Sequence, residues 1–394
     1  MKSLFALILT VICVAPFAGE HTVEATLGLL GLGALAYQFA PSGVLFNIPV
    51  QDARGIFTKG LISVYKEQTS VMSFLRSFFK PVESMTKEIS IAVRRGTEKV
   101  ATDVVRYSDG NRNTFDKSSE KIFVPPLYHE YLTANDHRLY DQVITALSQG
   151  NTTFFAEMTA ELAEDLMELQ KKIERAVELQ CAQILQTGII TLNSDTDIDF
   201  KRKAASIVAY NAANDFSVGT VDPSAVIEAG CIFIRQKGKS QGGTFNAILG
   251  GEALTELLDN PIIRGRGDVK DYDLMSIREP QRNAVGATLH GQLSCGSYKV
   301  NLWTYPEYYD NASGVSTPYI DPKKVIVLPE SPEFKLAYAA VPQLIENGTI
   351  PQKGAYLVQE FMDRKKTAHE VHIKSAPVAI PVAIDQIYTV TVLN

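Results

Sequence analysis

The sequence predicts an α+β fold that is built from several extended parts in a fixed order. Three features lead to this prediction. The last third of the chain reads as a series of strand-like runs and closes on one at 387–393. A long, charged amphipathic helix lies upstream of these runs, and an arginine-rich stretch dotted with glycines precedes the helix. Helical periodicity followed by alternating segments indicates helices and strands segregated along the chain.

Composition limits the classes of protein to which the chain can belong. Its 394 residues suffice for two or three domains or for one elongated subunit, and 45% of them are hydrophobic, which excludes bulk disorder. A formal net charge of −6 argues against an extensive basic groove for nucleic acid. The cysteines are widely spaced, so we expect separate thiols rather than a disulfide scaffold or a zinc site. They are Cys13, Cys181, Cys231 and Cys295.

Residues 1–50 form a hydrophobic N-terminal extension. Lys2 is followed by an apolar run over 4–14, as in a secretory signal, but Pro16 occupies a position that needs a small residue if the chain is cut after Ala18. A second apolar stretch at 25–46 is interrupted by glycines and a proline. We expect this extension to be buried against neighbouring subunits. A signal or membrane anchor is the alternative.

Two segments with different periodicities follow. Residues 51–83 read as an arm helix, since apolar residues recur at helical spacing until Pro81 ends the pattern. Residues 84–130 read as an extended loop, a two-stranded excursion with alternating residues at 89–93 and a turn cluster at 108–111. A long isolated hairpin is marginally stable, which implies that a partner subunit supports it.

Residues 131–203 are expected to contain a long helix and a short hairpin. Asn151 is a candidate N-cap, apolar positions recur from Phe154 to Ile184, and Gly188 closes the helix. At 1.5 Å per residue the helix would span about 50 Å, the length of a spine. Strand-like residues at 189–192 and 198–200 then predict the hairpin.

The remainder alternates helices and strands. Residues 204–345 read as an α+β domain with a strand at 231–234, a helix at 247–258 and strands at 293–304 and 324–328. Residues 346–394 read as returning strands.

One motif favours a rival reading. Residues 238–242 spell Gly-Lys-Ser-Gln-Gly, the pattern of a nucleophile elbow, and candidate partners follow in the hydrolase order. A secreted serine esterase using Ser240, with Asp268 or Asp271 and His369 or His372, is therefore the alternative. A long arm, hairpin and spine precede the motif where that fold needs strand–helix units. We expect no catalytic, cofactor-binding or metal-binding residues.

The ordered set of parts resembles the lambda-type major capsid protein family of tailed phages, major capsid protein E. The extended loop is similar in Arg94-Arg95-Gly96, Val104-Val105-Arg106, Gly110, Phe115 and Phe123-Val124-Pro125-Pro126. The spine end is similar at 178–188 followed by 198–200, and the C-terminus at Ser375-Ala376-Pro377 with the closing strand. The likeness covers about residues 53–394, and the apolar leader has no counterpart in it.

The resemblance implies a Hong Kong 97-type capsid fold. Its parts would be the arm, the extended loop, a peripheral domain at 131–203, an axial domain at 204–345, and C-terminal strands at 346–394 that return to the peripheral domain. It implies a major capsid protein without enzymatic activity or cofactor, which self-assembles as pentamers and hexamers into an icosahedral virion shell enclosing double-stranded DNA. An encapsulin-like compartment is an alternative with the same fold.

The implied partners are other copies of the chain, scaffolding, portal and decoration proteins, and packaged DNA nearby without specific binding, with no small-molecule substrate. Assembly would take place in the host cytoplasm. Intersubunit ion pairs are expected between arginines of the loop and acids of the spine, because such pairs fix register. The candidates are Arg94, Arg95, Arg106, Arg112, Asp165 and Glu168.

Overall fold

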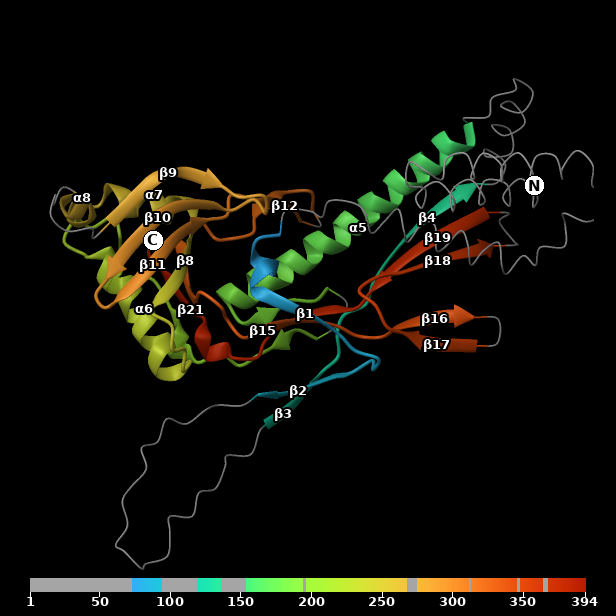
Figure 1. The fold of residues 1–394 in the computed structure, drawn as a ribbon, viewed down its shortest axis with the longest axis horizontal. Helices are drawn as coiled ribbons and strands as arrows, with labels where there is room; N and C mark the ends of the chain where they lie inside the picture. Colours follow the sequence, from blue (N-terminus) through green and yellow to red (C-terminus); the bar gives the residue numbers. More distant parts are fainter. Residues whose placement is uncertain are drawn as a thin grey trace, which may run out of the picture.

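A computed structural model describes residues 73–93, 119–135, 154–193, 196–267, 275–311, 313–345, 348–363 and 368–394. These residues form two units joined along one long helix, which gives the described chain an elongated outline (Figure 1). We call them the sheet domain and the elongated domain. The α+β class predicted from the sequence is confirmed.

The sheet domain is organised around seven strands in the order β7-β21-β14-β8-β11-β10-β9. The strands are β7 (Ile207–Val208), β8 (Thr244–Leu249), β9 (Met275–Arg282), β10 (Thr288–Cys295), β11 (Tyr298–Thr304), β14 (Lys324–Pro329) and β21 (Tyr388–Thr391). The helices are η4 (Ala204–Ser206), α6 (Pro223–Lys237), α7 (Gly251–Asp259) and α8 (Pro261–Gly267). Nearly all of β8 and β14 is buried, so the centre of the sheet lies in the hydrophobic core.

The elongated domain is organised around helix α5 (Phe154–Gln186), whose 33 residues confirm the long helix predicted from the sequence. Its sheets have the strand orders β1-β15-β20 and β18-β19-β4, and the others in this domain are two-stranded. The strands are β1 (Phe79–Glu83), β2 (Ile89–Val93), β3 (Ser119–Phe123), β4 (Tyr128–Asn135), β5 (Ile189–Ile190), β6 (Ile198–Asp199), β12 (Tyr308–Asp310), β13 (Ser316–Pro318), β15 (Phe334–Tyr338), β16 (Val341–Ile345), β17 (Gly348–Gln352), β18 (Leu357–Asp363), β19 (Ala368–Ser375) and β20 (Pro377–Pro381). Single turns of 3-10 helix lie at η3 (Leu75–Phe78) and η5 (Ile384–Gln386).

Helix α5 packs through two parts of its length. Near the middle, Leu166, Leu169 and Ile173 form a cluster with side chains of β18 and β19. Towards its C-terminal end, Val177, Cys181, Ile184 and Leu185 are buried in the larger core shared with β1, β15 and β20. A helix of about 50 Å can therefore connect two distant packing sites, as a spine would.

Gly188 ends the helix as predicted. Its φ is +78°, and its N–H donates to the carbonyl oxygens of Gln183 and Ile184. Glycine adopts this left-handed conformation without the steric cost of a Cβ atom, so the chain can turn into the hairpin β5–β6. That hairpin, expected at 189–200, is confirmed.

Helix α6 corrects the strand predicted at 231–234. Ile227, Cys231 and Ile234 are buried at helical spacing on one face. The helix begins with Asp222, whose side chain accepts a hydrogen bond from the Ser224 N–H, and Pro223 occupies the first turn. The apolar run therefore belongs to a buried helix face, because periodicity over a short run cannot separate the two structures.

Two element boundaries and one strand pairing also differ from the sequence prediction. The helix expected at 247–258 begins only at Gly251, since 244–249 is the central strand β8. The arm helix expected to reach Lys80 is replaced at 79–83 by β1, which pairs in parallel with β15. The final strand, β21, pairs with β14 and β7 in the sheet domain rather than with the strands that precede it.

The three cysteines in the described chain, Cys181, Cys231 and Cys295, are free and buried. Among the described residues, no helix is both long enough and apolar enough to cross a membrane. The predictions for residues 1–50 and for Cys13 lie outside the described residues.

Candidate assembly surface

Strands β2 and β3 form a two-stranded ribbon at the start of the predicted extended loop. They pair with each other in antiparallel register, from Ile89 opposite Phe123 to Val93 opposite Ser119, and with no other described strand. Figure 1 shows the ribbon directed away from helix α5 and the sheets. The structure therefore describes the base of the excursion predicted for 84–130. The rest of the excursion lies outside the described residues.

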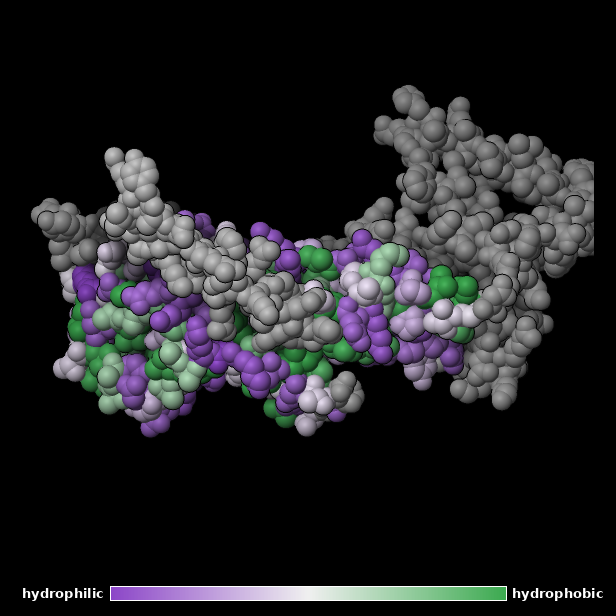
Figure 2. Space-filling view, turned by 90° about the horizontal axis from the view of Figure 1, so that it is seen from below, coloured by the Kyte–Doolittle hydropathy of each residue, from purple (hydrophilic) through white to green (hydrophobic). Residues whose placement is uncertain are grey.

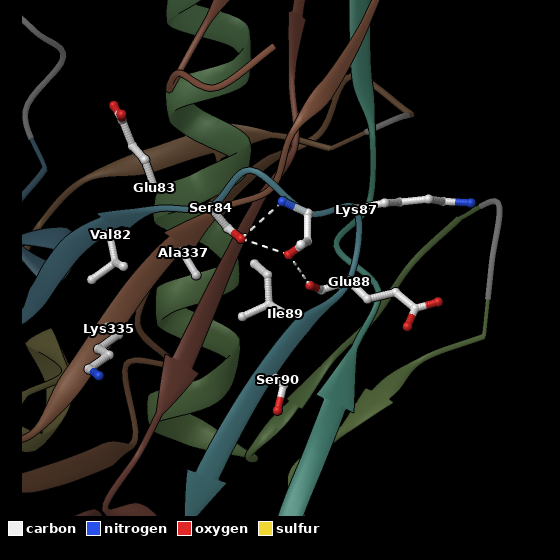
Figure 3. Close-up of a pocket in the computed structure, with 10 residues that line it drawn as sticks. Val82, Glu83, Ser84, Lys87, Glu88, Ile89, Ser90, Lys335 and Ala337 are labelled. Carbon is white, nitrogen blue, oxygen red and sulfur yellow. Dashed lines mark hydrogen bonds between the residues drawn. The ribbon is translucent and has the colours of Figure 1, made fainter. Parts of the chain in front are cut away.

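A groove of about 670 Å³ opens beside the ribbon, between it and the end of the β1–β15 pair. Val82, Ile89 and Ala337 contribute apolar lining, while Glu83, Lys87, Glu88 and Lys335 contribute charges of both signs. Figure 3 shows these side chains around the turn from β1 to β2.

The turn beside the groove is held by short hydrogen bonds. The hydroxyls of Ser84 and Thr86 lie 2.7 Å apart, and the Thr86 hydroxyl donates to the Glu88 carbonyl oxygen at 2.6 Å (Figure 3). The Ser84 N–H donates to the Tyr338 carbonyl oxygen at 2.8 Å. The base of the ribbon is thus fixed to the body of the domain, which gives the ribbon a defined direction.

Apolar side chains are exposed around this base. The exposed fractions are 43% for Val82, 64% for Met85, 48% for Val124 and 51% for Leu127. Single exposed apolar residues are common, and Figure 2 shows hydrophobic residues scattered among hydrophilic ones on the face seen from below. Four exposed apolar side chains at the base of one ribbon, however, are typical of a surface that another chain covers.

Glu178 on α5 anchors the segment that leads into β1. Its carboxylate, 1% exposed, accepts hydrogen bonds from the backbone N–H groups of Leu75 at 2.8 Å and Arg76 at 3.1 Å. These are donors at the start of η3 that have no partner within the turn. A side-chain hydrogen bond links Tyr305 to the same carboxylate. One buried acid therefore holds the arm against the spine.

Burial raises the pKa of Glu178 to about 7, although the two backbone N–H groups, Tyr305 and the Arg76 guanidinium act in the opposite direction. Arg76 in turn donates to the Tyr338 hydroxyl at 3.1 Å. Burial lowers the pKa of Arg76, but nearby Tyr338, Tyr356 and Glu174 raise it more, so that the guanidinium stays charged.

The structure leaves most of the predicted intersubunit residues untested. Arg94, Arg95, Arg106 and Arg112 lie outside the described residues, and so does the side chain of Asp165. Glu168 is exposed on α5 and pairs with Lys171 at 2.8 Å, which lowers the pKa of its carboxyl group. This exposed pair within one helix costs little to separate, so Glu168 is accessible to an arginine of another chain.

Ser240 does not lie on a nucleophile elbow. That motif needs a strand before the serine and a helix after it, whereas here helix α6 precedes Ser240 and strand β8 follows. His372 lies on β19 in the elongated domain, where its Nδ1 is 2.7 Å from Nε2 of His129. Asp268, Asp271 and the side chain of His369 lie outside the described residues. The serine esterase alternative is therefore wrong.

Sequence reasoning missed Glu178 as an anchor. The available signal was an acidic residue on the apolar stripe of α5, beside Val177 and four residues before Ala182. Such a residue in a helix is buried with a partner or marks a break in the stripe. Its partners lie about a hundred residues upstream, and their arrangement has no sequence signature.

The chain is similar to a known protein family and to several solved structures. Residues 61–392 match the profile of the family described as phage major capsid protein E. No curated protein matches the chain.

Several solved structures are similar to the chain. A protein described as a prophage capsid protein of Escherichia coli CFT073 has 15% identity and a TM-score of 0.56, over 85% of this chain and 98% of that one. A phage-related protein of Bordetella bronchiseptica RB50 has 10% identity and a TM-score of 0.47, over 84% and 95%. The mature capsid of bacteriophage PhiM1 has 11% identity and a TM-score of 0.41, over 82% and 88%. At this low identity, the similarity to the Escherichia coli protein is a similarity of fold alone. The other two structures have lower TM-scores and add nothing to it.

Proposed function

The chain belongs to the phage major capsid protein E family, and from this premise we propose that its copies assemble as pentamers and hexamers into an icosahedral shell around double-stranded DNA. It is a structural protein of the capsid and not an enzyme. In the shell, the sheet domain would lie nearest the symmetry axes and the elongated domain at the periphery.

The observation that carries this proposal is the β2–β3 ribbon, which has no third strand among the described residues and projects from the body of the chain (Figure 1). Two strands alone are marginally stable in water, so the ribbon gains support when it lies on a neighbouring copy. Four exposed apolar side chains at its root extend the surface available for that contact. Obligate interfaces of this kind commonly bury more than about 2,000 Å².

The charges of the predicted loop support the same role. Arg94, Arg95, Arg106 and Arg112 fall between β2 and β3 in the sequence, and the chain as a whole carries a net charge of −6. Arginines on an excursion can pair with Asp165 or Glu168 of the next copy and so set the register of two subunits. The mild negative charge suits a shell wall that faces packaged DNA without gripping it.

Further partners follow from the family. We infer that scaffolding, portal and decoration proteins act with this chain, and that assembly takes place in the host cytoplasm before the protein becomes part of the virion.

The proposal is tested by negative-stain microscopy of the expressed chain and of the variant Arg94→Glu plus Arg95→Glu. Wild-type chains are expected to form regular closed shells, while the variant stays soluble and forms none. A control with the same change in net charge on exposed positions of the sheet domain, Lys237→Glu plus Lys299→Glu, should still assemble. Normal shells from the loop variant would refute the role given to these arginines.

The same preparations separate a virion shell from an encapsulin-like compartment. Shells isolated from phage-producing cells should contain double-stranded DNA, which nuclease treatment before and after disruption would reveal. Shells filled with a cargo enzyme instead would contradict the proposed function.

A further inference from the structure

Two histidines are in contact on the three-stranded sheet β18-β19-β4, which runs beside helix α5 (Figure 1). One face of this sheet packs on α5, where Val371 and Ile373 of β19 are buried. Because side chains alternate along a strand, His129 of β4 and His372 of β19 lie on the opposite face. The Nε2 atom of His129 is 2.7 Å from the Nδ1 atom of His372. We call this contact the histidine bridge.

His372 is the more enclosed of the two histidines. Its Nε2 atom lies 3.2 Å from a carboxylate oxygen of Glu370. The ring of Tyr131 stacks on the imidazole at a centroid distance of 5.2 Å, and the ring of Phe361 meets it edge-on at 4.7 Å. The side chain of His372 is 12% exposed, whereas His129 is an exposed residue. His129 can therefore turn into solvent, while His372 is held by its neighbours.

Only one hydrogen atom fits between the two nitrogens of the histidine bridge. The contact with Glu370 requires an N–H group at Nε2 of His372. When His372 is neutral, its Nδ1 atom accepts a hydrogen bond from the Nε2–H group of His129. When His372 is protonated, its Nδ1–H group donates to a neutral His129, and the positive charge lies beside Glu370. If both rings are protonated, two N–H groups face each other, two like charges meet, and the hydrogen bond is lost.

The charges around the bridge oppose the second proton. Lys374 lies directly opposite His129 in the β19–β4 ladder. Burial, Lys374 and His372 lower the pKa of His129, while Glu130 acts in the opposite direction. Glu130 belongs to the face of the sheet that packs on α5, where Lys172 lies 3.9 Å from its carboxylate. The described side chains of β18 on the face of the bridge are uncharged, and so are both strands of the neighbouring β16–β17 hairpin.

We propose that the histidine bridge is a pH-sensitive switch within the chain, closed when the pair carries at most one positive charge and open when it carries two. In the open state His129 turns into solvent, and His372 keeps its proton beside Glu370. Strand β4 stays in the sheet, because its eight-residue backbone ladder with β19 does not involve the imidazoles. The switch acts at the edge strand that follows β3, and so at the point where the ribbon returns to the elongated domain.

The sign of the pH dependence follows from the unfolded state. A free histidine has a pKa of about 6.5, so the two histidines of the unfolded chain accept a second proton more readily than the closed bridge does. The bridge therefore stabilises the folded chain at neutral pH, and this contribution is lost as pH falls through the second protonation step.

NMR titration of the full-length, unassembled chain, labelled with carbon-13 at Cε1 of histidine, tests the switch. The signals are assigned with His129→Ala and with His372→Phe, which keeps an aromatic ring between Tyr131 and Phe361. We expect the pair to titrate in two steps that differ by more than about one pH unit, since the two protons interact. In His372→Phe, His129 should titrate in one step at a higher pH than the second step of wild type. Wild-type curves equal to those of the single variants would overturn the proposal.

A double-mutant cycle measures the bridge itself. At pH 8, His129→Ala and His372→Phe together should deviate from additivity by a factor of about five in the equilibrium constant of unfolding, the size expected for one hydrogen bond. One pH unit below the second titration step the deviation should disappear, because the bridge is then open in wild type. A deviation of the same size at both pH values would contradict the switch, and so would additivity at pH 8.

His290 provides the matched control. It lies on β10 in the sheet domain, where its Nε2 atom is 2.8 Å from the Thr304 hydroxyl and burial lowers its pKa. His290→Ala should be additive with His129→Ala at both pH values and should leave the two-step titration of the bridge unchanged. Coupling between His290 and His129 as large as that across the bridge would overturn the assignment of the switch to this contact.

Discussion

Gly188 lies against the aliphatic part of Arg202, so close that a Cβ atom on Gly188 would overlap the Cγ and Cδ atoms of the arginine. The backbone at Gly188 also has a φ of +78°. Arg202 is itself immobilised, since its guanidinium donates to the carbonyl oxygens of Leu185 at 3.0 Å and Ile387 at 3.2 Å. The end of α5, the following hairpin and the C-terminal strand thus meet at one arginine.

Replacing Gly188 by alanine should therefore destabilise the fold by about 2–5 kcal/mol. The left-handed conformation costs an alanine about 1–2 kcal/mol, and displacing packed side chains costs about 1–3 kcal/mol more. Urea denaturation would measure the change. Gly251→Ala is the matched control, because a Cβ there meets nothing within 4 Å and the residue begins helix α7. Equal effects of the two substitutions would contradict this account.

Arg202→Met should also destabilise the fold, by about 3–5 kcal/mol. The guanidinium is the donor to the buried carbonyl oxygens of Ser206 and Ile387, and a methionine leaves them without it. Burial lowers the pKa of Arg202 to about 10, so the group is still charged at neutral pH. Arg202→Lys should recover part of the loss, because it keeps the charge but not the planar fork.

The two residues should be coupled when they are changed together. With Arg202 shortened to alanine, the overlap with a Cβ at position 188 disappears, so Gly188→Ala should cost less than it does in wild type. A double-mutant cycle of unfolding free energies would measure an interaction of about 1–2 kcal/mol. Strict additivity would show that the clash is relieved in another way.

The buried acid on the spine predicts a pH dependence of stability. The pKa of Glu178 is about 7 in the folded chain and near 4.5 when unfolded, so the folded state binds more protons between these values. The contribution of Glu178 to the free energy of unfolding therefore falls as pH rises from about 4.5 to about 7, by roughly 3 kcal/mol. Thermal unfolding of wild type and Glu178→Gln at pH 5 and pH 8 should show this difference shrink in the variant. An unchanged pH profile would rule out the assignment.

The buried thiols should resist alkylation. Burial raises the pKa of Cys231 to about 12 and that of Cys181 well above its ordinary value. Because the thiolate is the reactive form, iodoacetamide at pH 8 should leave Cys181, Cys231 and Cys295 unmodified in the native chain and label them after denaturation. Peptide mass spectrometry would detect each adduct, and fast labelling of Cys181 without denaturant would show that the end of α5 opens.

The sequence was sufficient for the elements with long, regular patterns. The apolar stripe of α5 and the glycine that ends it predicted a helix that the structure confirms. Helix α6 was missed because its run of apolar residues at 231–234 also suits a strand, although Asp222 and Pro223 at its start were a helix signal.

Contacts between residues far apart in the sequence could not be predicted from the sequence. The partners of Glu178 lie 103 and 102 residues away, and the acceptors of Arg202 include a carbonyl oxygen 185 residues away. No local pattern encodes such meetings, since they depend on how complete elements pack. The hairpin at 341–352 has no clear alternating pattern in the sequence, because its strands are short and contain two prolines.

The position of β21 has a consequence for biosynthesis. This strand lies between β7 and β14, so the seven-stranded sheet has a gap until residues 388–391 have left the ribosome. All the other strands of that sheet are thus synthesised before it can close. Nascent polypeptides on a crowded polysome would lack a finished sheet domain with which to associate, so the order of synthesis itself would delay polymerisation until β21 has joined the sheet.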